Sequence, residues 1–218
     1  MKPNSKVLIG NLDDECVEVV KEQCHINNSQ LFMLDKYKDL GNRKFDYHNC
    51  TYEIKSFAKY QIHNSCLAIQ AFEIISKDLN INIDYSLIKT ALINSVWQNR
   101  FEIVKDKPLV ILDGAHNIHG IQALCESFDQ FKGRKCIVFS ALKRKEYLKM
   151  SMMLKKHTDR LIITTFDNKE VIDLNQFNDY ETIIDYKQAI DEAINKYDNI
   201  LICGSLYFLS DVVLNYKF

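Results

Sequence analysis

Apolar residues in the first hundred positions follow the pattern of a short α/β segment and then two helices. Leu67, Ala71, Ile74, Ile75 and Leu79 recur at the spacing of one helix face. Short apolar runs lie on either side of an acidic segment that is well placed for a helix N-terminus. The elements expected here are strand 6–9, helix 13–24, strand 30–34, a strand or hairpin over 45–55, and helices 63–79 and 85–96.

From residue 100 onward, short apolar runs alternate regularly with amphipathic segments. Such alternation predicts a mostly parallel sheet that is covered by helices on both faces, so the fold class is α/β. The expected strands are 101–104, 109–112, 135–139, 160–166, 181–185 and 199–203, with helices 118–131, 145–157, 187–197 and one that begins near 206.

Composition narrows the functions open to this 218-residue chain. Its 28 basic and 29 acidic residues give a net charge of -1, which argues against broad nucleic-acid binding because that requires a basic surface. The densest basic cluster is Lys143, Arg144, Lys145 and Lys149, and most such runs are solvated helix starts. No apolar stretch reaches the roughly 20 residues needed to cross a bilayer, so no membrane partner is expected.

The seven cysteines are scattered and form no C-x-x-C pair. No targeting segment is visible at the N-terminus. An odd number of cysteines without a signal peptide indicates reduced thiols and a cytoplasmic location rather than a disulfide framework.

The most informative segment is 110–117, VILDGAHN, in which an apolar run stops at an acid and a glycine before a predicted helix. In open α/β sheets, ligands bind at the carboxyl ends of strands, where such turns lie. Asp113, His116 and Asn117 then place a charge, a titratable ring and an amide at one point. The alternative interpretation is structural, because Asp or Asn before a helix is usually an N-cap and a lone histidine is usually a surface residue.

His116 and His119, with Asp113 nearby, also permit a zinc hypothesis. Their spacing matches no common zinc motif, so no metal ligands are predicted in this chain.

Several short motifs in order resemble the folylpolyglutamate synthase/dihydrofolate synthase family of the Mur ligase superfamily. Segment 112–117 looks like its DGAHN signature, and five further segments look like other motifs of the family. These segments are 2–7 (KPNSKV), 63–68 (HNSCLA), 97–102 (WQNRFE), 138–142 (VFSAL) with the following Lys145, and 204–207 (GSLY).

The resemblance implies both a fold and an activity. It implies a Rossmann-like Mur ligase C-terminal domain over 99–218, preceded over 1–98 by a remnant of the α/β ATPase domain. The implied reaction phosphorylates a carboxylate of dihydropteroate or of a folate with ATP, and the amine of L-glutamate then attacks the acyl phosphate. ATP and magnesium are the implied cofactors, and folate and L-glutamate are the implied substrates.

The resemblance also implies roles for individual residues. Asn64, Arg100 and Asp113 fall on positions that contact ATP, His116 could orient glutamate or accept its proton, and Ser205 is a candidate contact for glutamate. Structural alternatives remain for four of them: an N-cap for Asn64 and for Asp113, a surface pair with Glu102 for Arg100, and a simple turn serine for Ser205.

The chain departs from the family in ways that affect these expectations. None of its six glycines opens a G-x-x-x-x-G-K-[ST] loop, so the phosphate cradle is expected in a separate N-terminal P-loop half. Gln98-Asn99 stand where the family has Pro-Gly, which should remove the tight turn before Arg100. Further departures are Ile118 for a proline, Ser140 for a glycine and Arg144 for an acid.

These observations favour the C-terminal part of a folate–glutamate ligase that is inactive alone. One rival is a noncatalytic remnant or binding module that pairs with another chain. The other is a Mur-type amide ligase with a different acceptor.

Overall fold

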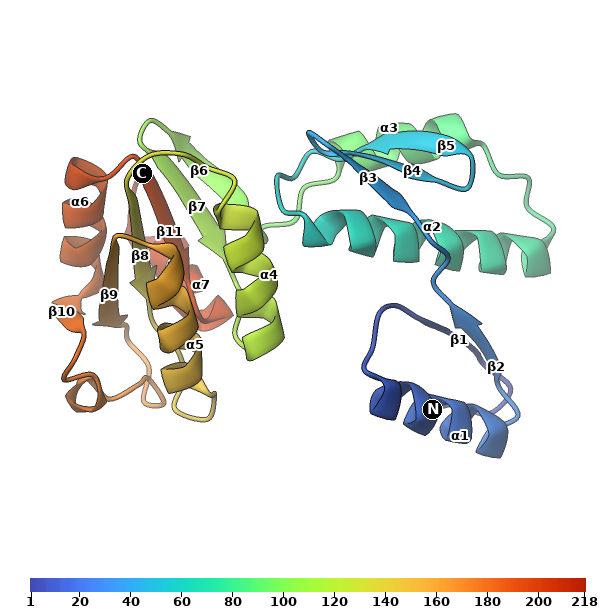
Figure 1. The fold of residues 1–218 in the computed structure, drawn as a ribbon, viewed down its shortest axis with the longest axis horizontal. Helices are drawn as coiled ribbons and strands as arrows, with labels where there is room; N and C mark the ends of the chain where they lie inside the picture. Colours follow the sequence, from blue (N-terminus) through green and yellow to red (C-terminus); the bar gives the residue numbers. More distant parts are fainter. The chain divides into compact units, whose positions relative to one another are not determined.

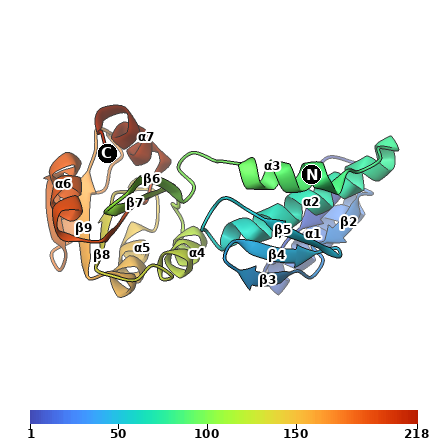
Figure 2. The ribbon, with the colours of Figure 1, turned by 90° about the horizontal axis from the view of Figure 1, so that it is seen from above.

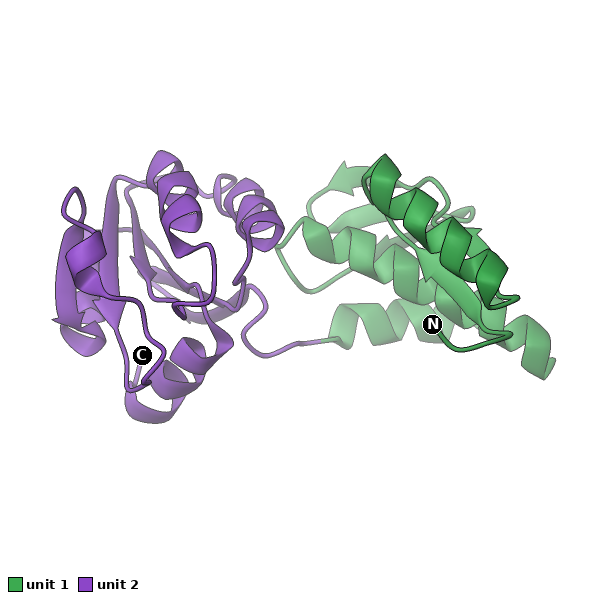
Figure 3. Ribbon diagram, turned by 90° about the horizontal axis from the view of Figure 1, so that it is seen from below, with its two compact units in different colours: residues 1–95 green, residues 96–218 purple.

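The computed structural model describes all 218 residues. The chain forms two compact units, Met1–Ser95 and Val96–Phe218, which Figure 3 colours separately. No helix in either unit is long and apolar enough to cross a membrane.

Unit 1, residues 1–95, combines a parallel pair of strands, an antiparallel three-stranded sheet and three helices (Figure 1). β1 and β2 are paired in parallel and are connected through α1. β3, β4 and β5 form the antiparallel sheet in sequence order. The elements are β1 Lys6–Ile9, α1 Asp14–Ile26, β2 Gln30–Met33, β3 Lys38–Gly41, β4 Lys44–Tyr47, β5 Cys50–Glu53, α2 Tyr60–Leu79 and α3 Tyr85–Asn94.

Helix α2 joins the two sheets of unit 1. Its buried face packs on aromatic side chains of β4 and β5, including Phe45, Tyr47 and Tyr52. Its first turns lie at the carboxyl end of β1, since a Cβ at Gly10 would meet the ring of His63 at 2.4 Å. α2 therefore places residues 63 and 64 beside the end of a parallel strand.

Unit 2, residues 96–218, is built on one six-stranded sheet in the order β10-β9-β8-β11-β7-β6. All neighbouring strands are parallel except β6, which pairs antiparallel with β7 at one edge. Its elements are β6 Glu102–Asp106, β7 Leu109–Asp113, α4 Ile118–Phe128, β8 Lys135–Phe139, α5 Tyr147–Leu154, β9 Arg160–Thr165, β10 Glu181–Asp185, α6 Tyr186–Lys196, β11 Asn199–Cys203 and α7 Leu206–Asn215, with short 3-10 turns η1 Lys155–His157 and η2 Leu174–Gln176.

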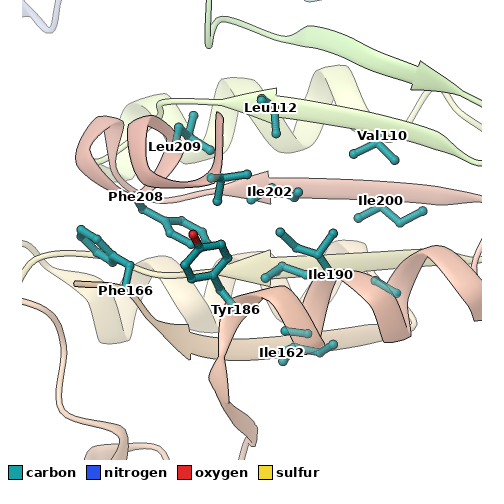
Figure 4. Close-up of a cluster of buried hydrophobic side chains, with 14 of the residues drawn as sticks. Val110, Leu112, Ile162, Phe166, Tyr186, Ile190, Ile200, Ile202, Phe208 and Leu209 are labelled. Atoms are coloured by element: carbon teal, nitrogen blue, oxygen red, sulfur yellow. The ribbon is translucent and has the colours of Figure 1, made fainter. Parts of the chain in front are cut away.

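Helices cover both faces of this sheet (Figures 1 and 2). Alternate strand residues such as Val110, Ile162 and Ile202 pack with Ile190 of α6 and Phe208 of α7 (Figure 4). The intervening strand residues point to the opposite face because side chains alternate along a strand, and α4 and α5 lie on that side. The strands are accordingly apolar on both faces, as parallel strands in α/β proteins usually are.

The structure confirms the predicted α/β class and the mostly parallel, helix-covered sheet. Several predicted elements differ from the structure in their bounds, and one strand was missed. α2 begins at Tyr60 rather than His63, because Gln61 and Ile62 already make turn hydrogen bonds. β3 was not predicted, and its four residues are all exposed, so no apolar alternation marks them. Helix 145–157 shortens to α5 and then tightens into η1.

Ser140 follows β8, and its hydroxyl is fully buried without a hydrogen-bond partner. We expect Ser140→Ala to raise the free energy of unfolding by about 1 kcal/mol, because an unpaired buried polar group is destabilising. Ser151 is equally buried, but its Oγ donates to the Leu148 carbonyl at 2.9 Å. Ser151→Ala should therefore lower stability. Urea unfolding of both variants checks this, and a loss of stability in Ser140→Ala would contradict it.

Candidate functional site

The strand order of unit 2 brings three loops together at the carboxyl edge of its sheet. β11 lies between β7 and β8, so the loops that follow these three strands are immediate neighbours. β6 is antiparallel and Glu102 pairs with Leu112, so the segment that leads into β6 lies at the same edge. This is the edge of the sheet at which open α/β proteins usually bind ligands.

Asp113 ends β7 and is almost completely buried, with 1% of its surface exposed. Its carboxylate accepts hydrogen bonds from the backbone N–H of Phe101 at 2.9 Å and of Ala115 at 2.8 Å. Asp113 is therefore enclosed within its turn rather than exposed to a cleft. The N-cap alternative was wrong, because Asn117 caps α4 through a 2.7 Å bond from the Gly120 N–H.

The loop before β6 is tightly folded. Asn99 and Phe101 have φ values of 58° and 51°, the left-handed region that Asn tolerates better than most residues. The Asn99 carbonyl accepts from the Gly114 N–H at 2.8 Å. The predicted loss of the tight turn in Gln98-Asn99 was wrong, since Asn99 takes the backbone conformation for which glycine is the usual residue.

Arg100 lies between these two left-handed residues and is half-buried. The alternative pairing with Glu102 is not formed, because the Glu102 carboxylate accepts from the Asn99 N–H at 2.7 Å instead. The Arg100 guanidinium makes no hydrogen bond or ion pair within the chain. It is therefore available to an anion at this edge.

His116 is half-buried in the turn between β7 and α4. Its Nδ1 lies 2.9 Å from the Gly114 carbonyl oxygen. A carbonyl can only accept, so Nδ1 must carry a proton. In the neutral ring Nε2 then keeps its lone pair and can accept a proton.

Ser205 caps α7 and is 3% exposed, and its Oγ accepts from the Tyr207 N–H at 3.2 Å. It is therefore a helix N-cap rather than a simple turn serine. The adjoining Leu206 packs so closely on Gly114 that a Cβ there would lie 2.2 Å from its Cδ2. This contact locks the turn after β11 against the turn after β7.

Asn64 belongs to unit 1, whereas the other four predicted site residues belong to unit 2. It is exposed in the second turn of α2, and its side-chain amide donates to the Gln61 Oε1 at 3.1 Å. The N-cap alternative was wrong because α2 begins at Tyr60.

Neither a thiol nor a metal cluster adds chemistry to this site. Cys203 pairs in register with Asp113, and burial, followed by the Asp113 charge, raises the pKa of its thiol well above the ordinary value. The thiol therefore stays neutral and is a poor nucleophile. No group of three or more His, Cys, Asp or Glu side chains is arranged to hold a metal ion.

Comparison with known proteins agrees with this geometry. Residues 99–206 match the family model described as the Mur ligase, glutamate ligase domain. The chain is 32% identical over 164 residues to the dihydrofolate synthase/folylpolyglutamate synthase of Bacillus subtilis, a match that covers 70% of this chain. The chain belongs to the folylpolyglutamate synthase/dihydrofolate synthase family. Within this family of the Mur ligase superfamily, the glutamate ligase domain coincides with most of unit 2.

Solved structures of family members share the fold. The folylpolyglutamate synthase of Mycobacterium tuberculosis in complex with ADP and AMPPCP superposes with a TM-score of 0.83 at 17% identity and covers 98% of this chain. An FPGS complex with AMPPCP and folate gives a TM-score of 0.78 at 26% identity over 97% of this chain.

The chain spans much less than the whole length of these relatives. The match covers 38% of the Bacillus subtilis protein and 38% of the folylpolyglutamate synthase of Lacticaseibacillus casei, which is 27% identical over 169 residues. It covers 55% of the Mycobacterium tuberculosis chain.

The buried hydrogen bonds of Asp113 predict a stability effect. Asp113→Ala should lower the free energy of unfolding by about 2–4 kcal/mol, because two backbone donors lose a charged acceptor. Arg100→Ala should change it by less than about 0.5 kcal/mol, since the guanidinium has no partner to lose. Urea unfolding followed by circular dichroism compares the two variants. Equal stability losses would contradict this assignment.

Proposed function

We propose that this chain is the C-terminal part of an ATP-dependent ligase that adds L-glutamate to a folate, either dihydropteroate or tetrahydrofolate. The observation that carries the proposal is the set of polar groups at the carboxyl edge of the unit 2 sheet. There a buried carboxylate holds two turns together, leaving an unpaired guanidinium and a histidine with a free ring nitrogen, and the N-cap serine of α7 lies at the same edge. The chain that contains these groups belongs to a family, and the relatives compared above are named as folylpolyglutamate or dihydrofolate synthases.

The proposed reaction has two steps. The acceptor carboxylate first takes the γ-phosphoryl group of ATP, giving an acyl phosphate and ADP. The glutamate amine then attacks the acyl carbon, the C–O bond to phosphate breaks, and an amide and inorganic phosphate form. The protein must hold several anions together and keep water away from the mixed anhydride.

His116 is proposed as the proton acceptor from the attacking amine. The Gly114 carbonyl fixes the Nδ1 proton, so the neutral ring offers Nε2 as the base. An imidazole suits this step because one ring nitrogen can accept a proton while the other keeps its own hydrogen bond.

We propose that three residues contribute to the ATP site: Arg100, Asp113 and Asn64. The planar guanidinium of Arg100 suits phosphate oxygens, and it has no competing partner in the chain. Asp113 acts through the loop that it holds, because its carboxylate is buried against the Phe101 and Ala115 amides. Asn64, exposed on α2, is proposed to contact ATP from unit 1.

Ser205 is proposed to contact the incoming glutamate. Its oxygen accepts from the Tyr207 N–H, so the hydroxyl proton is available to donate to a carboxylate. Ser205 is held in place as the N-cap of α7.

We propose that ATP and magnesium are held mainly by an N-terminal P-loop half, which is absent from these 218 residues. Residues 1–98 would then be the remainder of the ATPase domain and 99–218 the ligase domain. The chain has no cluster suited to a metal, so no step is assigned to magnesium on it. With all seven cysteines free, we place the protein in the cytoplasm.

The experiment described in the next paragraph also tests two other functions. A noncatalytic binding module would pair with a P-loop half and yield no product. A Mur-type amide ligase would release phosphate with an acceptor other than folate.

The test is a chimera that joins the N-terminal part of the Bacillus subtilis relative to this chain. ATP-dependent transfer of radiolabelled L-glutamate to tetrahydrofolate or dihydropteroate, with matching phosphate release, is the expected result. A folded chimera that forms no product and releases no phosphate would overturn the ligase proposal.

In that chimera, His116→Ala should lower kcat by about 10²–10⁴-fold if the ring accepts the amine proton. His119 is exposed on α4 and makes no hydrogen bond, so His119→Ala serves as the matched control and should keep full activity. A raised KM for glutamate with kcat preserved would instead assign His116 a binding role.

The 218-residue chain should bind magnesium-ATP far more weakly than the chimera, because three side chains do not replace a P-loop. Isothermal calorimetry of both proteins measures the difference. Micromolar affinity in the chain alone would contradict the proposed division of the nucleotide site.

A further inference from the structure

Arg100 lies between two residues whose backbone conformation is rare for side chains with a Cβ. Asn99 and Phe101 are both left-handed, with φ values of 58° and 51°. Such residues persist only where the surrounding structure holds them. The position of the Arg100 guanidinium therefore depends on the groups that fix its two neighbours.

Phe101, on the C-terminal side of Arg100, is fixed by burial and by Asp113. It is 3% exposed, and its ring stacks on Phe131 with centroids 6.1 Å apart. Its N–H donates to the Asp113 carboxylate at 2.9 Å. These contacts hold one end of the turn firmly.

Asn99, on the N-terminal side of Arg100, is fixed through its backbone by Glu102 and Gly114. Its N–H donates to Glu102 Oε2 at 2.7 Å, and its carbonyl accepts from the Gly114 N–H at 2.8 Å. The Asn99 side chain adds no support, because its Oδ1 is buried without a hydrogen-bond partner. The bond to Glu102 is the stronger kind of hydrogen bond, since its acceptor is charged.

The residue at position 99 makes this bond more important in this chain than in the motif that it resembles. A glycine, the residue of that motif, adopts the left-handed region without steric cost. Asn99 has a Cβ and needs an external constraint to stay there. The Glu102 carboxylate supplies that constraint.

The same bond keeps Glu102 away from Arg100. Residues two positions apart share a face of a regular strand, so an extended backbone would bring these opposite charges together. The left-handed Phe101 interrupts the strand, and β6 begins only at Glu102, whose backbone pairs with Leu112. The Glu102 carboxylate accepts from the Asn99 N–H and forms no ion pair. The Arg100 guanidinium is therefore left free.

We propose that Glu102 is a positioning residue for the nucleotide: its bond to the Asn99 N–H holds the turn 99–101 in shape and keeps Arg100 unpaired and ready to bind phosphate oxygens. The identity of the ligand as ATP rests on the proposed function. Glu102 itself is an acid and would repel an anion, so it acts only through Arg100.

The first test titrates the ¹⁵N-labelled 218-residue chain with inorganic tripolyphosphate, followed by NMR. This probe carries the phosphate charges of ATP without the nucleoside, and the amides of 99–101 should shift. Arg100→Ala and Glu102→Ala should each weaken binding by roughly 10-fold, the loss expected for a hydrogen bond to a charged group. Arg100→Ala/Glu102→Ala should bind no more weakly than Arg100→Ala, because Glu102 acts through Arg100.

Glu102→Gln distinguishes the hydrogen bond from the charge. The glutamine side chain keeps an oxygen that can accept from the Asn99 N–H, so most of the binding should return. Removal of an acid normally strengthens the binding of an anion, which is opposite to the result expected for Glu102→Ala. Stronger tripolyphosphate binding in Glu102→Ala would show simple repulsion and overturn the proposal. An absence of shifts at 99–101 up to tens of millimolar tripolyphosphate would also overturn it.

Asp159→Ala is the matched control. The Asp159 carboxylate accepts from the Lys135 N–H at 2.7 Å, just before β9 and therefore at the opposite edge of the same sheet. This variant removes the same charge and the same kind of bond, and it should leave tripolyphosphate binding unchanged. Equal weakening in Asp159→Ala and Glu102→Ala would indicate a general loss of structure and contradict the positioning role.

The chimera separates this role from the proposed function. In an active chimera, Glu102→Ala should raise the KM for ATP by roughly 10-fold and leave the KM for glutamate unchanged. If the KM for ATP is unchanged, the positioning role is wrong and the ligase proposal stands. If the chimera is inactive, the ligase proposal fails, and the tripolyphosphate titration of the chain still decides whether Glu102 positions Arg100.

Discussion

The candidate site depends on one buried carboxylate. Asp113 lies at the end of a strand whose last four residues are buried, and it accepts hydrogen bonds from the N–H groups of Phe101 and Ala115. These two donors belong to segments on either side of the β6–β7 hairpin, so one side chain sets the position of both turns. A buried charge is tolerated when it is hydrogen-bonded in this way. Together with the 2.8 Å bond from the Gly114 N–H to the Asn99 carbonyl, it holds Arg100 and His116 at the same edge of the sheet.

The close contacts around Asp113 extend this constraint to the neighbouring strand. Gly114 leaves room for the Leu206 side chain, and Gly204 leaves room for the Ser140 carbonyl, so the turns after β7, β8 and β11 pack closely against one another. The result is a rigid edge that carries polar groups with few internal partners. Such preorganisation favours the binding of charged ligands, because little ordering is required when the ligand arrives.

Much of this could be predicted from the sequence. The regular alternation after residue 100 identified the parallel sheet, since strands covered on both faces are continuously apolar. The DGAHN turn was found because a glycine and polar residues interrupt such a run. The burial of Asp113 could not be predicted, because its donors come from Phe101 and Ala115 backbone groups that no side-chain pattern reveals. One feature of the sequence indicated the left-handed backbone of Asn99, namely that it stands at a glycine position of the resembling motif. That replacement was interpreted as a loss of the turn. The close packing of the turns after β7, β8 and β11 depends on strand order, which the sequence leaves open.

Amide hydrogen exchange tests most directly whether Asp113 holds the site together. In the native chain the Phe101 and Ala115 amides should exchange slowly, although both lie in turns. In Asp113→Ala these two amides should exchange much faster, and residues 97–101 and 114–116 should follow, while Val138 in β8 keeps a rate set by global unfolding. Unchanged protection of Phe101 and Ala115 relative to Val138 would contradict the account.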